Sequence, residues 1–168
     1  GLHAERTGRY AGIIAAHMGL DEKDRNIVKR CAYFHDIGKI GIPDKLLQKP
    51  EALTDAETSV MQAHTEIGYK FLSTFPLLRD EAETAFSHHE RCDGKGYPRR
   101  LKKKNIPLYS RIVSVADAFD ALLFSRSYHP AMPVDVALGR ITDGSGPQFD
   151  PEIVDILRKN VREINSGK

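Results

Sequence analysis

The stretch RIVSVADAFDALLF, residues 111–124, decides the fold class of this chain. Its apolar side chains fall on most sides of a helix, which predicts a central, buried helix rather than an amphipathic surface helix. Two aspartates, Asp117 and Asp120, interrupt its apolar surface. An unpaired carboxylate is costly to bury, so Asp117 needs a neutralising partner in the folded protein.

Helical periodicity also covers most of the chain outside this stretch, and several of the expected starts carry capping residues. Besides 111–124, the expected helices lie at residues 3–18, 21–38, 54–75 and 79–89, with a short one from Pro133 and a last one from Asp150-Pro151 to about 164. A long loop is expected at 92–108, and convincing strand alternation is absent from the sequence. The prediction is an all-α helical bundle.

The composition is that of one globular domain. The 168 residues are 40% hydrophobic and 29% charged, with a net charge of +2. This balance gives no reason to expect DNA or RNA binding. The basic run RRLKKK at 99–104 is interpreted as a solvated loop or, less simply, as a docking patch for an anionic partner. No apolar run approaches the roughly 18 residues of a membrane span. Two cysteines cannot form a disulfide framework, so a cytoplasmic setting is expected.

Histidines and aspartates at the ends and inner faces of separate helices carry the chemical information. His35-Asp36 ends one apolar helix, His64 lies within another, and His88-His89 ends a third. Each histidine alone would be a surface or hydrogen-bonded core residue, but a cation explains the set, because it neutralises carboxylates and accepts imidazole lone pairs. Mixed His/Asp ligands suit iron, manganese or zinc. The number of ligands predicts two or more metals in a bundle core.

Two motifs together resemble those of a known family. HDIGKIGIP at 35–43 and HHERCDGKGYP at 88–98, followed by VADAFDAL at 115–122, are similar to the HD-GYP family. This family is a branch of the HD metal-dependent phosphohydrolases, which in bacteria hydrolyse cyclic di-GMP. The similarity covers nearly the whole chain, so residues 1–168 are expected to form one HD-GYP domain. The chain begins within a helical pattern, and an output domain with a sensory or receiver region upstream is expected.

The resemblance implies a set of metal ligands. They are His3, His35, Asp36, His64, His88, His89 and Asp117. A further family glutamate would fall before Gly1, so a binuclear and a trinuclear site both stay open. Iron or manganese is the expected metal. In the expected arrangement Asp36 bridges two ions, one held by His35 and Asp117 and the other by His64 and His88.

Three further residues match family positions that contact substrate. Lys39 matches a phosphate-facing lysine and is expected to share catalysis with Asp36, while Arg126 and Tyr97 are expected to bind substrate. The loop around Tyr97 also implies contact with GGDEF-domain partners. The expected reaction is hydrolysis of cyclic di-GMP to linear pGpG, with GMP after a second round.

Other interpretations stay open beside this one. Lys39 can simply neutralise a helix C-terminus, and Tyr97-Pro98 can be only a rigid loop element. A module that binds a dinucleotide or a partner with weak catalysis is an alternative function. Another HD-type reaction, on a different nucleotide or with oxygen at a di-iron centre, is a second. The segments 99–105 and 120–130 depart from the family pattern near the pocket mouth, which leaves substrate preference less determined than metal binding.

Overall fold

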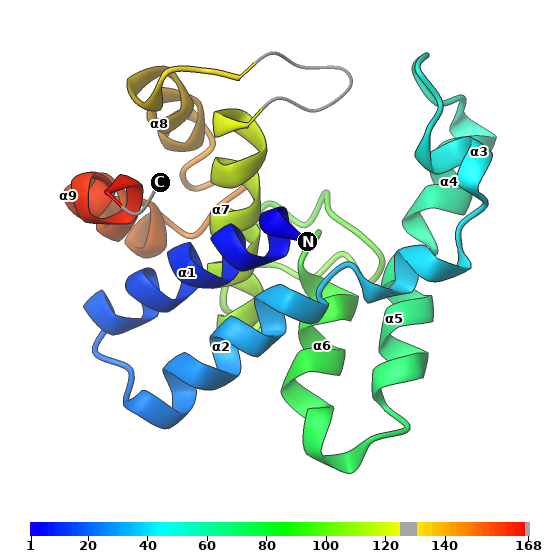
Figure 1. Ribbon diagram of the computed structural model, residues 1–168, viewed down its shortest axis with the longest axis horizontal. Coiled ribbons are helices and arrows are strands. Elements are labelled where there is room, and N and C mark those ends of the chain that lie inside the picture. The colour runs from blue at the N-terminus through cyan, green and yellow to red at the C-terminus, as the bar shows by residue number, and fades with distance from the viewer. Residues whose placement is uncertain (125–130, 167–168) are drawn as a thin grey trace.

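The computed structural model describes residues 1–124 and 131–166, and these residues form helices joined by turns and loops (Figure 1). The larger part of the molecule is a body of five helices. They are α1 (Leu2–His17), α2 (Glu22–Phe34), α7 (Leu108–Leu123), α8 (Val134–Asp143) and α9 (Pro151–Asn165). The all-α prediction is confirmed. None of the helices in the described ranges is both long and apolar enough to cross a bilayer.

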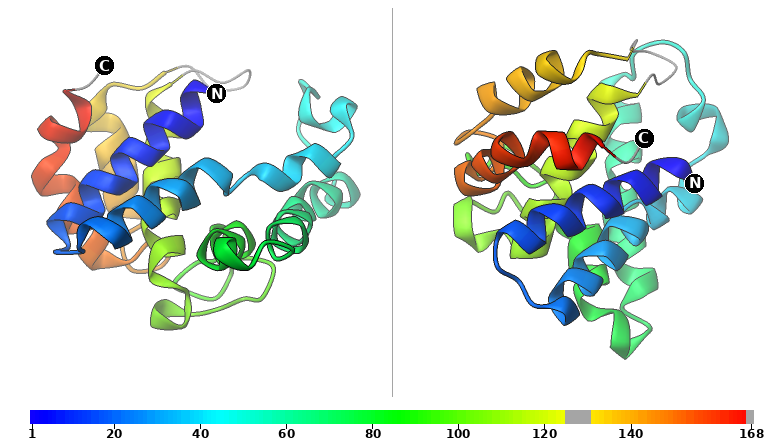
Figure 2. Two further views of the ribbon diagram at one scale, coloured as in Figure 1. Left: turned by 60° about the horizontal axis from the view of Figure 1, so that its bottom comes forward. Right: turned by 60° about the vertical axis from the view of Figure 1, so that its left-hand side comes forward.

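Helix α7 is the centre of this body, as its apolar sequence predicts. Its residues Ile112, Val113, Val115, Ala116 and Phe119 have no exposed surface and belong to one apolar core shared with α1, α2, α8 and α9. Figure 2 shows α1, in blue, crossing α7, in yellow-green, in both views. The start of α1 therefore lies against the C-terminal half of α7, where the two aspartates of that helix are found.

A second, smaller part of the molecule stands beside this body. It contains η1 (Ile37–Gly41), α3 (Asp44–Leu47), α4 (Asp55–Gln62), α5 (His64–Leu72), η2 (Pro76–Leu78) and α6 (Arg79–Ser87), and η3 (Lys103–Asn105) follows in the loop before α7. Helices α5 and α6 pack side by side (Figure 1). Their apolar cluster is small, with only Leu72, Ala82 and Ala85 buried at its centre. We call α5 and α6 the arm.

The prediction of one helix over 54–75 is wrong. The Thr54–Glu57 capping box is present, but the helix ends at Gln62 and a new one begins at His64. Ala63, between them, has φ −60° and ψ −17°, close enough to helical values that the apolar periodicity continues across the break. Periodicity therefore could not reveal it.

The second expected helix is also shorter than predicted. It begins after the predicted cap Asp21, whose side chain accepts a hydrogen bond from the Asp24 N–H, but it ends at Phe34, and the chain continues as the 3-10 helix η1. The cause is a close approach of η1 to α5. A Cβ added to Gly38 would lie only 1.8 Å from the carbonyl oxygen of His64. Only glycine can occupy this position without moving one of the two backbones.

Candidate metal centre

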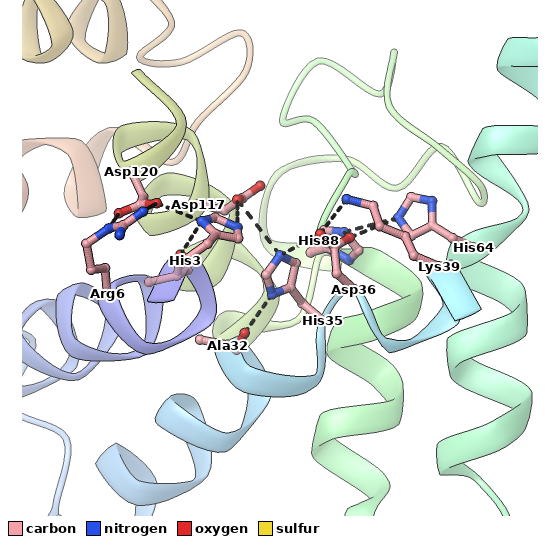
Figure 3. A network of polar contacts seen from close by, with 11 residues as sticks. His3, Arg6, Ala32, His35, Asp36, Lys39, His64, His88, Asp117 and Asp120 are labelled. Atoms are coloured by element: carbon pink, nitrogen blue, oxygen red, sulfur yellow. Dashed lines mark hydrogen bonds and ion pairs between the residues drawn. The ribbon is translucent and has the colours of Figure 1, made fainter. Parts of the chain in front are cut away.

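A row of polar side chains crosses the molecule from α1 and α7 to the arm (Figure 3). It contains two groups whose candidate ligand atoms lie within 4.8 Å of one another. The first group is His3, His35 and Asp117, and the second is Asp36, His64, His88 and His89. The structure thus brings together all seven residues predicted as metal ligands, from α1, the end of α2, α5, the end of α6, and α7.

Three histidines of this row are oriented by hydrogen bonds to the backbone. In His35, His64 and His88, Nδ1 lies 2.6, 2.7 and 3.0 Å from a backbone carbonyl oxygen about one turn earlier in the chain. A carbonyl can only accept, so Nδ1 carries the proton and Nε2 presents a lone pair. The helix ends that carry these histidines therefore aim three unprotonated nitrogens inward.

These lone pairs point toward a carboxylate oxygen, which has no proton to donate to them. Oδ1 of Asp36 lies 3.5 Å from Nε2 of His64 and 3.7 Å from Nε2 of His88. Among the described residues, Asp36 Oδ1 and His35 Nε2 are buried atoms with no hydrogen-bond partner. Acceptors facing acceptors in a buried site are costly unless a cation lies between them. The residues therefore fit divalent cations, and the donor set of imidazoles and carboxylates suits first-row transition metals.

Asp36 stands between the two groups. Its Oδ1 faces the imidazoles of the arm, whereas its Oδ2 lies 3.4 Å from Nε2 of His35 in the first group. One carboxylate oxygen is thus directed to each group. This is the arrangement that a bridging carboxylate requires.

The first group is supported by a second buried aspartate. Nε2 of His3 lies 3.1 Å from Oδ1 of Asp117, and Nδ1 of His3 donates a hydrogen bond of 2.6 Å to Oδ2 of Asp120. Asp120, only 1% exposed, also accepts hydrogen bonds of 2.7 and 3.0 Å from the Arg6 guanidinium. Asp120 therefore orients His3. Arg6 was not foreseen, because nothing in its sequence surroundings distinguishes it from a surface arginine.

The electrostatics of the second group favour metal-binding protonation states. Burial, with the neighbouring His64, lowers the pKa of His89 to about 4. Burial likewise lowers the pKa of the other two imidazoles of that group. Burial alone would raise the pKa of Asp36, but His35 and Lys39 outweigh it and hold that pKa well below its usual range. Neutral imidazole and ionised carboxylate are the forms that coordinate metals. In the first group burial alone would lower the pKa of His35, but Asp36 and Asp117 outweigh it and raise that pKa.

Lys39 lies at the edge of this centre. It belongs to the 3-10 helix η1. Its Nζ contacts Oδ2 of Asp36 at 2.5 Å. The ammonium group is thus next to the carboxylate that joins the two groups.

The loop after α6 covers the second group. The Tyr97 ring stacks on His89, with centroids 4.8 Å apart and an angle of 22° between the planes. Glu90, only 3% exposed, accepts hydrogen bonds from the backbone N–H groups of Arg99 and Leu101, at 2.7 and 2.9 Å. Glu90 therefore closes the loop that carries Tyr97. Sequence reasoning did not single out this glutamate, although its place directly after two ligands was a usable signal.

Arg126, predicted to bind substrate, falls at positions 125–130 and lies outside the described residues.

A family model described as an HD domain matches residues 2–153. The chain belongs to the HD domain family. A "Cyclic di-GMP phosphodiesterase" of Thermotoga maritima is 45% identical over 164 residues, which are 96% of this chain and 45% of that protein. A "3'3'-cGAMP-specific phosphodiesterase 3" of Vibrio cholerae is 38% identical over 157 residues, 94% of this chain and 34% of that one. This HD domain chain thus spans less than half the length of these relatives.

A solved structure has the same fold. The HDG"Y"P protein Bd1817 from Bdellovibrio bacteriovorus is 18% identical and superposes with a TM-score of 0.77 over 95% of this chain and 51% of that one. The resemblance drawn from the two HD-GYP motifs is confirmed at the level of the family.

Proposed function

We propose that this HD domain is the catalytic domain of a metal-dependent phosphodiesterase whose substrate is a cyclic dinucleotide, cyclic di-GMP first. One observation carries the proposal. Buried Nε2 lone pairs and an ionised, buried carboxylate oxygen converge without a proton donor between them, so the site is built for cations. The names of the relatives, which act on cyclic di-GMP and 3'3'-cGAMP, support the substrate class.

The metal ligands are His3, His35 and Asp117 in one group and His64, His88 and His89 in the other, with Asp36 shared. Iron or manganese fits these donors, and whether two or three ions bind stays open. Bound metals of this kind supply a water acidic enough to attack phosphorus near neutral pH and positive charge for the phosphoryl oxygens.

The chain's own residues prepare the rest of the reaction. Asp36 directs one oxygen to each ligand group and so sets where the phosphodiester is held. Lys39, beside Asp36, provides a positive charge that can balance the negative charge growing on the nonbridging phosphate oxygens. Tyr97, stacked over His89, covers the second group and restricts access of water from that side. Departure of a ribose 3′-oxygen yields linear pGpG, and a second round yields GMP.

The remaining parts of the proposal concern the longer protein. The relatives extend well beyond the matched region, which supports a fused sensory or receiver region. The loop around Tyr97 is the proposed contact for a GGDEF-domain partner, and the cytoplasm is the proposed location. The partner contact and the location rest on the family resemblance.

Metal analysis combined with product identification tests the function. Protein purified without oxygen is loaded with iron or manganese, and single-turnover reactions with cyclic di-GMP are resolved by chromatography. We expect at least two ions per chain and formation of pGpG. Tight binding of cyclic di-GMP with no cleavage would instead make the domain a binding module, and oxygen uptake without cleavage would point to oxygenase chemistry.

A further inference from the structure

A pocket of about 630 Å³ opens next to the second ligand group, between the α4–α5 junction and the loop that follows α6. Gln62 and Glu66 line its helical wall, and Lys95, Tyr97 and Arg100 line its loop wall. Tyr97 belongs to both places, because its ring also stacks on His89. The pocket is therefore separated from the candidate metal ligands by a single aromatic ring.

The two walls of this pocket differ in chemistry. The helical wall offers a carboxylate and an amide, while the loop wall offers two cations beside an aromatic ring. Asp93 is the acid nearest in sequence to Lys95, but its side chain pairs with Arg91 at 2.9 Å. Glu66 has only a distant partner, with Lys70 Nζ at 3.8 Å. In the part of the chain that the structure describes, the charged groups of the two walls are thus left available to a ligand.

Arg100 and Lys103 share an uncommon backbone conformation. Arg100 has φ +56°, a left-handed conformation that is uncommon for residues with a Cβ. Lys103, three residues later in the same basic run, has φ +48° but does not line the pocket. Backbone strain of this kind persists where the surroundings hold it in place. Arg100 and Lys103 form a matched pair for mutation. Both are cationic and have the same backbone conformation, but only Arg100 lines the pocket.

We propose that this pocket binds the nucleotide unit of a cyclic dinucleotide that is not being cleaved at the metals, with Glu66 selecting guanine and Arg100 and Lys95 contacting the second phosphate. This inference rests on the proposed function and deepens it. A carboxylate offers only acceptors, which complement the N1–H and N2–H donors of guanine and oppose the N1 acceptor of adenine. Arg100 and Lys95 recognise a phosphate that every cyclic dinucleotide carries.

Two variants separate the two roles. Glu66→Gln is expected to lower kcat/KM for cyclic di-GMP by about 10-fold relative to cyclic di-AMP, the cost of one lost base contact. Arg100→Gln is expected to raise KM for both dinucleotides by a similar factor and to leave their ratio unchanged. Both side chains are exposed, so folding should be preserved.

Matched controls and a baseless substrate make the test decisive. Lys103→Gln and Glu51→Gln, exposed and outside the pocket lining, should leave every rate at the wild-type value. Hydrolysis of bis(p-nitrophenyl) phosphate, which has no base and one phosphate, reports on the metal centre alone. If wild-type protein cleaves that ester but no cyclic dinucleotide, the proposed function and the pocket assignment both fall. If wild-type protein cleaves cyclic di-GMP and Glu66→Gln keeps the guanine preference, only the pocket assignment is overturned.

Discussion

The two groups of candidate ligands are positioned by different parts of the molecule. His3 and Asp117 project from α1 and α7, whose inner faces belong to the large apolar core of the body. His64, His88 and His89 come from the ends of α5 and α6, which share an apolar cluster centred on only three buried residues. The first group is thus positioned by ordinary packing of long helices, and the second by the short arm.

What holds the second group in place is close backbone contact rather than apolar burial. Gly38 packs directly against the start of α5, where His64 lies, and Gly96 approaches the backbone at residues 89–91 so closely that an added Cβ would lie 2.4 Å from the His89 carbonyl. Such contacts tolerate no added atom, whereas an apolar core can redistribute a small change over many neighbours. The two groups should therefore respond differently to mutation.

Removing the residue shared by both groups should have the largest effect. In Asp36→Ala, each group loses a carboxylate oxygen, so we expect metal content to fall in both and phosphodiesterase activity to drop by more than about 10²-fold, the loss seen when one electrostatic group is removed from a buried site. Metal analysis and single-turnover hydrolysis measure this. Asp143→Ala, at an exposed position, is the control. Wild-type turnover with depleted metal would refute the bridging role of Asp36.

Adding one methyl group between η1 and α5 should damage the second group selectively. Gly38→Ala places a Cβ 1.8 Å from the His64 carbonyl oxygen and 2.5 Å from the Gly68 nitrogen. We expect the free energy of unfolding to fall by about 1–3 kcal/mol, as in other overpacked sites. The second group should lose its bound metal, so that fewer ions are bound per chain, while the first group keeps its ion. Denaturant titration and metal stoichiometry measure the two effects.

Gly139→Ala is the matched control for this change. Within residues 1–124 and 131–166, and the backbone of α8 itself aside, nothing lies within 4 Å of a Cβ at Gly139, which is inside α8. Here the same substitution should raise the free energy of unfolding by about 0.5–1 kcal/mol, because alanine is the better helix former. If both variants lose stability alike, the close approach of η1 to α5 does not explain Gly38.

Sequence reasoning predicted the large helical body better than the smaller part that contains the arm. The all-α class and the burial of α7 were predictable because the apolar pattern of residues 111–124 is local and nearly continuous. The break at Ala63 was not, since its dihedral angles leave the helical periodicity intact. The end of α2 at Phe34 depends on Gly38 meeting α5, a contact between segments far apart in the chain. No local pattern reports such a contact.

The candidate site shows the same contrast at the level of single residues. The seven ligand positions came from motif spacing and family resemblance, which name residues but not their surroundings. Arg6 beside Asp120 and Glu90 under the loop act through hydrogen bonds that appear only once the chain is folded. Sequence reasoning therefore named the candidate ligands that the structure brings together, and it missed Arg6 and Glu90.

A change outside the ligands should weaken the first group alone. Asp120→Asn keeps the size of the side chain but removes the charge that accepts from His3 and Arg6. Loss of such an outer hydrogen bond typically costs about 10- to 100-fold in metal affinity. We expect this loss for the ion of the first group only, measured by competition with a chelator. Equal losses at both groups would show that the groups form one cooperative unit.

The smallest effect on metal binding is expected from opening the loop over the second group. In Glu90→Gln one carboxylate oxygen becomes an amide N–H₂ that faces the backbone N–H of Arg99 or Leu101, so one buried hydrogen bond is lost at a cost of about 1–3 kcal/mol. Because Glu90 touches no ligand of the first group, metal affinity there should not change. Amide hydrogen exchange should accelerate across residues 91–101, and KM should rise more than kcat falls, since Tyr97 loses its fixed place over His89. If KM rises but amide exchange in the loop is unchanged, Glu90 acts on the metal centre itself. The loop would then be held by other contacts, such as those of Arg99 with Ser87 and Glu83.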